Sequence, residues 1–266
     1  MPIPAKIHYI WLGHGEKSQK LKDCIESWKR CMPECEIIEW NEDNFDIDLC
    51  KFTRDSYDKK MYAFTSDVIR LWALYNYGGY YLDTDVYMYK SLRDFENEEG
   101  FTGFEDVKYP ATATMGAEKG NPVIKMMLDA YMIRDFYTYP VWTDYIKYEE
   151  TSTCIYSDIL AALGIDRMSN KLQRIPHFAV YPTSYFFTKG EGYTHHSFTG
   201  SWRIGDNMSI ESKNYCIARK CKSCERQATC DLLENIYKER LMYRPFENIE
   251  EIWKQKRGDA DGYNSR

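Results

Sequence analysis

Hydrophobic and polar positions along the chain predict strands that alternate with helices. Residues 7–12 and 36–40 are short apolar runs, which are typical of buried strands. Between them, residues 17–30 predict a helix, and Pro33 follows shortly after its expected end. This alternation of strand and helix is typical of an α/β sheet.

The strongest helix signal covers residues 62–77 and leads directly into a strand. Its apolar side chains recur at helical spacing, at Phe64, Val68, Leu71, Trp72 and Tyr75. Gly78 and Gly79 come next and can adopt the positive φ that ends a helix. Residues 80–82 then predict a buried strand that runs straight into two aspartates.

Weaker patterns of the same two kinds continue along the second half of the chain. We expect short strands at residues 101–104, 112–116 and 178–181, and helices at residues 121–131 and 155–163. After residue 202 the chain becomes basic and rich in cysteine, and its last residues are polar. We therefore predict an α/β domain over residues 1–205, a basic, cysteine-rich helical extension over residues 206–257 and a flexible tail over residues 258–266.

Composition and charge narrow the function classes. The chain has 266 residues and a net charge of -6, which argues against a general nucleic-acid-binding protein. We expect no membrane span, because no run of about 18 apolar residues occurs. The first residues lack a basic segment followed by an apolar run, so we also expect no signal peptide. The odd number of cysteines, nine, indicates a reducing compartment, and we expect the cytoplasm.

Two aspartates, Asp83 and Asp85, follow the strand expected at residues 80–82. In extended backbone, residues two apart point to the same face at a spacing of about 6–7 Å, so both carboxylates could converge on one cation. Oxygen ligands suit Mg²⁺ or Mn²⁺, and open α/β sheets bind ligands beyond the carboxyl ends of their strands. The alternative interpretation is a polar turn in which the aspartates accept backbone hydrogen bonds.

A second charged pair lies within the helix expected at residues 62–77. Asp67 and Arg70 are three residues apart and share one face of a segment that is apolar nearly all round, which implies burial. An exposed ion pair would contribute little to stability, whereas an unpaired buried charge is costly. Together with Asp83 and Asp85, this pair favours a polar ligand site with a metal over a simple turn.

Several separated motifs resemble the glycosyltransferases that carry a D-x-D sugar-binding motif. They are IPAKIHYIWLG, CIESWKRCMPECEIIEWNEDNF, AFTSDVIRLWALYNYGGYYLDTDVY, GFE and HHSFTGSW, and they occur in the order expected of that family. The family includes bacterial capsular-polysaccharide sugar transferases, yeast-type α-mannosyltransferases and the glucosyltransferase domains of large clostridial toxins. The resemblance runs from Ile3 to Trp202 and implies a GT-A-type nucleotide-sugar-binding fold, with a central mixed sheet flanked by helices.

The resemblance implies which residues bind the nucleotide-sugar donor. Trp11 would stack on the nucleotide base, and Ile10 would offer backbone contacts. Asp67 and Arg70 would hold the ribose and sugar region. Two further residues, Ser66 and Tyr81, would line that region.

The same resemblance implies a divalent metal at the D-x-D motif. Asp83 would act on sugar, ribose or metal-bound water, and Asp85 would ligate the metal directly, so both are candidate catalytic residues. Toxin-type members supply a further carboxylate ligand from a loop that ends in tryptophan. Here that loop carries His195 and His196, and we expect His196 to be the ligand, with a solvent-facing loop position as the alternative. At the end of the loop, Ser201 and Trp202 would contact the diphosphate.

The resemblance implies a metal-dependent, retaining glycosyltransferase. Its donor would be a nucleotide sugar, with a UDP-sugar expected, and its acceptor a saccharide or a lipid-linked saccharide in surface polysaccharide synthesis. One alternative is a haloacid-dehalogenase-like phosphatase, which also places D-x-D after an apolar strand, although usually near the start of its domain. The other is an inactive nucleotide-sugar-binding module, and the intact set of charged residues argues against it.

The expected extension carries four cysteines in the spacing C-x4-C-x2-C-x5-C, namely Cys216, Cys221, Cys224 and Cys230. Four thiolates could hold a structural Zn²⁺ in a tetrahedron, and unpaired reduced cysteines are the alternative. The segment is also basic, so it could contact an anionic lipid surface at the inner face of a membrane or simply face solvent.

Overall fold

The computed structural model describes residues 1–105, 109–133, 136 and 152–197. The boundary expected near residue 205, the cysteine-rich extension and the tail lie outside these residues. The four cysteines of the extension and the pair Ser201 and Trp202 therefore stay predictions. Across the described part of the chain, every helix is too short or too polar to cross a bilayer.

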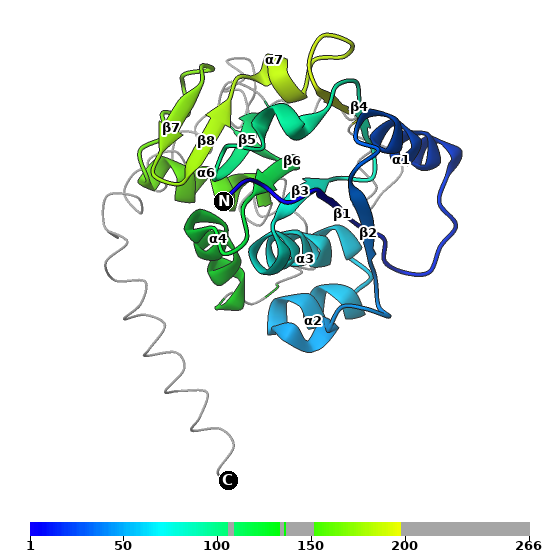
Figure 1. The fold of residues 1–266 in the computed structure, drawn as a ribbon. Helices are drawn as coiled ribbons and strands as arrows, with labels where there is room; N and C mark the ends of the chain where they lie inside the picture. Colours follow the sequence, from blue (N-terminus) through cyan, green and yellow to red (C-terminus); the bar gives the residue numbers. More distant parts are fainter. Residues whose placement is uncertain (106–108, 134–135, 137–151, 198–266) are drawn as a thin grey trace, which may run out of the picture. The chain divides into compact units, whose positions relative to one another are not determined.

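Within the described residues, the centre of the fold is a seven-stranded mixed sheet (Figure 1). Its strands are β1 (Lys6–Ile10), β2 (Glu36–Trp40), β3 (Gly79–Leu82), β5 (Gly100–Phe104), β6 (Pro110–Ala117), β7 (Gln173–Ile175) and β8 (Phe178–Tyr181). They lie side by side in the order β2-β1-β3-β6-β5-β8-β7, with β1–β2, β1–β3 and β5–β8 parallel and the other pairs antiparallel. The carboxyl ends of β1, β2, β3, β5 and β8 therefore meet at one edge of the sheet, where α/β proteins bind ligands.

Helices pack against this sheet, which confirms the predicted α/β class with a central mixed sheet between helices (Figure 1). The α-helices are α1 (Gln19–Cys31), α2 (Lys51–Asp58), α3 (Tyr62–Tyr77), α4 (Pro122–Met132), α6 (Ser152–Ala162) and α7 (Thr183–Phe186). The part of the chain that the structure describes also contains two short 3-10 helices, η1 (Ile47–Leu49) and η2 (Leu92–Phe95). A separate antiparallel ribbon pairs β4 (Val86–Met88) with β9 (Thr194–His196).

Helices α1 and α3 cover opposite faces of β1. Neighbouring residues of a strand point to opposite faces, so Tyr9 and His8 identify the two sides. The ring of Tyr9 packs edge-on against Trp28 of α1, with 5.7 Å between ring centroids. The ring of His8 lies 6.3 Å from Tyr77, the last residue of α3. The sheet is therefore buried on both sides at the point where it carries the candidate donor-binding residues.

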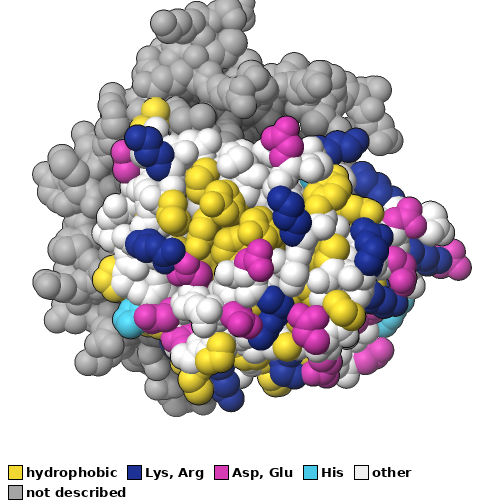
Figure 2. All heavy atoms as spheres, turned by 45° about the horizontal axis from the view of Figure 1, so that its top comes forward, with side chains coloured by type: hydrophobic (Ala, Val, Ile, Leu, Met, Phe, Trp, Pro, Cys, Tyr) yellow, Lys and Arg dark blue, Asp and Glu magenta, His cyan; other side chains and the backbone are white. Residues whose placement is uncertain are grey.

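The outer side of the core near β4 and α7 carries partly buried tyrosines. Tyr87, Tyr185 and Tyr193 pack against the buried cluster from outside. The rings of Tyr185 and Tyr193 are stacked, with centroids 5.9 Å apart and an interplanar angle of 11°. Figure 2 shows hydrophobic side chains, a class that includes tyrosine, gathered in one group on the face turned forward, with acidic and basic side chains around them.

Two glycines make the sharp connection between α3 and β3. Gly78 and Gly79 have φ values of 65° and 111°, in the region that only glycine adopts easily. A Cβ on Gly78 would lie 2.7 Å from the backbone nitrogen of Lys119, and one on Gly79 would lie 2.6 Å from the carbonyl oxygen of Lys6. Glycine is therefore required at both positions, as the sequence predicted, and the strand that leads to Asp83 starts without a loop.

His8 is fully buried in the sheet and is held in one neutral form. The indole Nε1 of Trp40 can only donate, so Nδ1 of His8 accepts its hydrogen bond at 3.1 Å. Nε2 of His8 therefore carries the proton and donates to the carbonyl oxygen of Gly78 at 2.8 Å. Burial lowers the pKa of His8 from 6.5 to about 4, and protonation would also place a second N–H against that of Trp40.

We expect His8 to make the protein less stable in mild acid. The unfolded histidine binds a proton near pH 6.5 and the folded one only near pH 4, so the free energy of unfolding falls as the pH drops between these values. The full effect is about 3 kcal/mol. Urea unfolding of the wild type and of His8→Gln at several pH values measures it, and the variant should show a flatter pH dependence. Equal slopes in both proteins would contradict this account.

Candidate functional site

The two aspartates of the D-x-D motif converge through a turn. Strand β3 ends at Leu82, and the N–H of Asp83 still donates to the carbonyl oxygen of Ala113 at 2.9 Å. The N–H of Val86 then donates to the carbonyl oxygen of Asp83 at 3.0 Å, which closes a turn over Asp83–Val86 before β4 begins. We expected an extended backbone to bring the two carboxylates to one face. The carboxylates do converge, but through a turn, because the chain leaves the sheet between Asp83 and Asp85.

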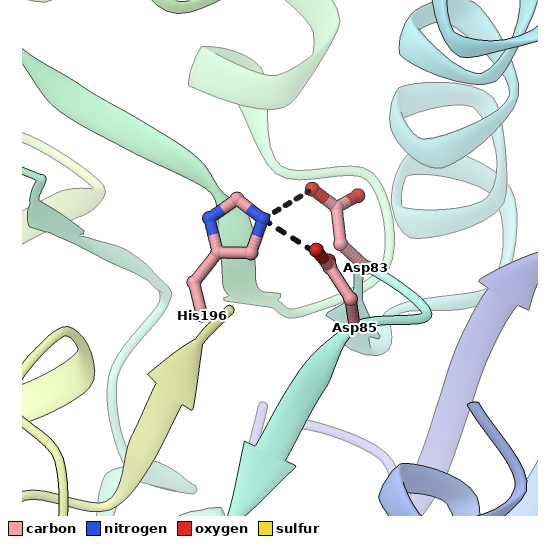
Figure 3. A group of neighbouring side chains, drawn as sticks. All are labelled: Asp83, Asp85 and His196. Carbon is pink, nitrogen blue, oxygen red and sulfur yellow. Dashed lines mark ion pairs between the residues drawn. The ribbon is translucent and has the colours of Figure 1, made fainter. Parts of the chain in front are cut away.

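His196 joins these aspartates from the other strand of the ribbon. β9 pairs with β4 so that His196 lies opposite Val86 and His195 lies opposite Tyr87. Nε2 of His196 is 3.1 Å from Oδ1 of Asp85 and 4.0 Å from Oδ2 of Asp83, and the ring points at both carboxylates (Figure 3). The backbone N–H of Ser197 also donates to the carbonyl oxygen of Asp85 at 3.1 Å. The ribbon thus places His196, the residue expected from the sequence, next to the motif.

The chemistry of this trio fits a divalent cation. One potential ligand atom from each of Asp83, Asp85 and His196 lies within 4.8 Å of the others. Burial alone would lower the pKa of His196, but its hydrogen bond to Asp85 and the charges of both aspartates raise it above the ordinary value. Two carboxylate oxygens and one imidazole suit Mn²⁺ and are compatible with Mg²⁺.

A buried ion pair supports the motif from α3. Nη2 of Arg70 lies 2.8 Å from Oδ1 of Asp67 and 3.4 Å from Oδ1 of Asp83, so one guanidinium links the helix to the motif. Nη1 of Arg70 also donates to the carbonyl oxygen of Thr112 at 3.1 Å. Burial raises the pKa of Asp67 although Arg70 opposes the shift. The predicted burial of Asp67 and Arg70 is therefore observed, and Arg70 is a fixed positive charge beside Asp83.

Two further residues predicted to line the donor site surround Arg70. The ring of Tyr81 lies 4.7 Å from the guanidinium carbon of Arg70, and its hydroxyl donates to Oδ1 of Asp83 at 2.6 Å. Oγ of Ser66 accepts a hydrogen bond from Nη2 of Arg70 at 3.2 Å. Asp83 thus receives both a hydroxyl and a guanidinium, and its carboxylate is held in one orientation.

Trp11 and Ile10 lie at the same edge of the sheet. β1 ends at Ile10, and its neighbour β3 runs parallel to it with His8 opposite Tyr81, so Trp11 follows β1 where Asp83 follows β3. The indole of Trp11 is partly exposed, while Ile10 is buried. The structure therefore leaves a partly exposed aromatic ring at the edge that carries the motif.

Two acidic residues at this edge were not part of the predicted donor site. Glu105 follows β5, and its charge contributes to raising the pKa of His196. Glu42 follows β2 and accepts two hydrogen bonds, one of them from the loop after Trp11. Glu105 is the last residue of the GFE motif quoted for the family resemblance, and sequence reasoning missed Glu42. A usable signal was the position of both residues just beyond strands that end at one edge.

Comparison with known proteins adds a family match to this geometry. Residues 18–102 match the model of the glycosyltransferase sugar-binding region containing a DXD motif. This confirms the expected D-x-D glycosyltransferase region, which includes Asp67, Arg70, Asp83 and Asp85, whereas Trp11 and His196 lie outside the matched residues. No curated protein matches the chain.

Two solved structures are similar to the chain. The first is the PaToxG glycosyltransferase, at 18% identity and a TM-score of 0.45, covering 60% of this chain and 68% of that chain. The second is a glycosyltransferase involved in the glycosylation of the major capsid of PBCV-1, at 10% identity and a TM-score of 0.40, covering 74% of this chain and 95% of that chain.

Proposed function

We propose, from the D-x-D sugar-binding region at residues 18–102, that this glycosyltransferase is metal-dependent and retaining and uses a nucleotide-sugar donor. The observation that carries the proposal is the convergence of Asp83, Asp85 and His196 at the sheet edge that also carries Trp11. The expected donor is a UDP-sugar, and the expected acceptor is a saccharide or lipid-linked saccharide of a surface polysaccharide. The retaining outcome is proposed from the resemblance of the motifs alone.

Asp83, Asp85 and His196 would hold Mn²⁺ or Mg²⁺ in this scheme. When bound, the ion supplies positive charge that stabilises the departing nucleoside diphosphate. Arg70 keeps Asp83 in place from the buried side, and Tyr81 does so through its hydroxyl. Such fixed groups stabilise charge that develops during the reaction without having to reorganise. Arg70 and Tyr81 would thus keep Asp83 in place at the metal site while the leaving group departs.

A hydrolysis screen of nucleotide sugars tests the proposed activity without knowledge of the acceptor. The protein is incubated with Mn²⁺ and each common UDP-, GDP-, ADP- and CDP-sugar, and release of the nucleoside diphosphate is measured. We expect turnover of one donor class that EDTA abolishes. NMR of the released sugar would report a retained anomeric configuration. Turnover of no donor, or turnover that EDTA leaves unchanged, would contradict the proposal.

We further propose a cytoplasmic location, with the basic extension in contact with the inner face of a membrane. The five basic side chains that motivate the membrane contact are Lys213, Arg219, Lys220, Lys222 and Arg226. Cosedimentation with vesicles that contain anionic lipid tests it, and vesicles of neutral lipid are the control. Equal recovery with both kinds of vesicle would exclude an electrostatic contact.

His196, and not its neighbour His195, is expected to support metal binding. Nε2 of His196 lies beside both aspartates, whereas His195 lies opposite Tyr87 in the ribbon. His196→Ala should therefore raise the Mn²⁺ concentration for half-maximal activity by about tenfold, the scale for a lost metal-site interaction. His195→Ala is the matched control and should leave that concentration within about twofold of the wild type.

Titration of donor hydrolysis with Mn²⁺ in the two histidine variants measures this difference. Equal Mn²⁺ requirements in both variants, or a larger requirement in His195→Ala, would show that His196 is not the ligand. Either result would leave the assignment of Asp83 and Asp85 to the metal site unchanged.

A further inference from the structure

The loop after β1 carries Trp11 and has a defined, unusual conformation. The backbone N–H of Trp11 donates to the carbonyl oxygen of Trp40 at 3.0 Å, and its indole Nε1 donates to the carbonyl oxygen of Gly15 at 2.7 Å. Gly13 and His14 between them have positive φ values of 86° and 54°. A non-glycine residue such as His14 adopts positive φ at a cost, so other contacts must hold the loop.

Glu42 provides the central contact of this kind. Its Oε1 accepts a hydrogen bond from the backbone N–H of Gly13 at 2.6 Å and another from the hydroxyl of Tyr57 at 2.9 Å. The Glu42 side chain is only 12% exposed, and Oε2 lies 4.0 Å from Nε2 of His14. Burial alone would raise the pKa of Glu42, but these hydrogen bonds lower it below its ordinary value, so the carboxylate stays charged and accepts them strongly.

The ring of Tyr62 leaves no room for a side chain at position 13. A Cβ on Gly13 would lie 2.4 Å from the ring of Tyr62, the first residue of α3. That ring in turn lies 5.4 Å from the ring of Tyr57 on α2. Glu42 and the two tyrosines therefore form a cradle for the turn at Gly13, two residues after Trp11.

A second contact of the loop contributes less. Lys17 pairs with Glu39 at 2.7 Å, and its Nζ lies 5.7 Å from the centre of the Trp11 ring. Both members of this pair are partly exposed, and exposed ion pairs contribute little. Of these two side-chain contacts, the buried one made by Glu42 is therefore the stronger support of the loop.

We infer that Glu42 is a positioning residue for donor binding, which holds the loop at Gly13 so that Trp11 is presented to the nucleotide base. The inference rests on the proposed function, in which Trp11 stacks on the base. Glu42 acts through Trp11 and makes no contact with the reacting atoms. Its effect should therefore appear in nucleotide affinity and should disappear once the indole is removed.

Titration calorimetry tests this role. The full wild-type chain is first titrated with UDP, GDP, ADP and CDP in the presence of Mn²⁺, and the nucleotide that binds most tightly is then used for every variant. Glu42→Ala should weaken its binding about tenfold, the size of a lost hydrogen bond to a charged group. Glu42→Gln should remain within about threefold of the wild type, because the amide oxygen can still accept both hydrogen bonds. Tyr57→Phe is a milder variant, with an expected loss of about threefold.

Glu36→Ala is the matched control. Glu36 is also on β2, but its side chain is 63% exposed and pairs only with Lys6 at the surface among the described residues, so nucleotide affinity should not change. Thermal unfolding of each variant shows whether the fold is intact. Glu42→Ala could also weaken nucleotide binding by destabilising the whole protein and not through Trp11. A double-mutant cycle with Trp11→Ala separates these two causes.

Trp11→Ala should weaken nucleotide binding by about 5- to 150-fold, the range for loss of base–aromatic stacking. Adding Glu42→Ala to Trp11→Ala should then change affinity less than about twofold, because the residue through which Glu42 acts is gone. Unchanged affinity in Trp11→Ala would overturn the stacking role, and with it the inference. Two other results would overturn the inference about Glu42 and leave the stacking role of Trp11 intact. The first is a loss of affinity in Trp11→Ala but none in Glu42→Ala. The second is a loss from Glu42→Ala that is equally large in the presence and in the absence of Trp11. Failure of all four nucleotides to bind the wild type would overturn both.

Discussion

Asp85→Asn is expected to reduce the rate of donor hydrolysis by about two to three orders of magnitude, or roughly 3–4 kcal/mol of transition-state stabilisation. Asp85 is buried, and its Oδ1 lies 3.1 Å from Nε2 of His196, so an amide would weaken the most enclosed oxygen ligand of the trio. An amide has almost the same shape, which separates the loss of charge from a change in packing. Initial rates over a range of Mn²⁺ concentrations measure the effect.

The control for this variant is Asp23→Asn, the same substitution at an exposed position of α1. It should retain the wild-type rate. Undiminished turnover in Asp85→Asn would refute the role of Asp85. A loss that is equal in both variants would point to a general effect of the substitution.

Arg70→Leu should lower the free energy of unfolding by about 3–5 kcal/mol, because removal of one partner leaves the other charge buried. Asp67 and Arg70 are both buried in the middle of α3 at a separation of 2.8 Å. Without Arg70, burial would raise the pKa of Asp67 further above its value in the unfolded chain. The deficit should therefore shrink as the pH falls and Asp67 becomes neutral.

Urea unfolding of Arg70→Leu, and of the double variant Arg70→Leu/Asp67→Leu, measures this cost. Replacing a whole buried ion pair by apolar side chains is often neutral, so the double variant should recover much of the lost stability. If the single variant were as stable as the wild type, the pair would not be the buried support of the motif. If the double variant were less stable than the single one, the unpaired charge would not be the cause.

Much of the fold could be predicted from sequence because its longer elements carry clear local patterns. Strands at residues 36–40 and 178–181 and the helix at residues 62–77 have the predicted bounds. The missed elements include the three-residue strands β4, β7 and β9, which are too short for a period-two pattern to register. The pairing of Val86 with His196 also depends on residues far apart in sequence, which no local pattern reports.

The candidate site was predicted in its residue types but not in its geometry. Asp67 and Arg70 could be predicted as buried because the helix around them is apolar on nearly every side. The turn between Asp83 and Asp85 could not, since alternation along a strand says nothing about where the chain leaves the sheet. The position of Glu42 just beyond a strand was a usable signal, but its contacts could not be predicted, because its partners Gly13 and Tyr57 come from two other elements.

The most direct test of the account is the binding of Mn²⁺ itself, measured by the loss of the electron paramagnetic resonance signal of the free ion. The wild type should bind Mn²⁺ at a saturable site that UDP or another nucleoside diphosphate strengthens. Asp85→Asn should abolish that site and His196→Ala should weaken it, whereas Asp23→Asn and His195→Ala should bind as the wild type does. Equal Mn²⁺ binding by the wild type and Asp85→Asn would contradict the assignment of Asp83, Asp85 and His196 as the metal site.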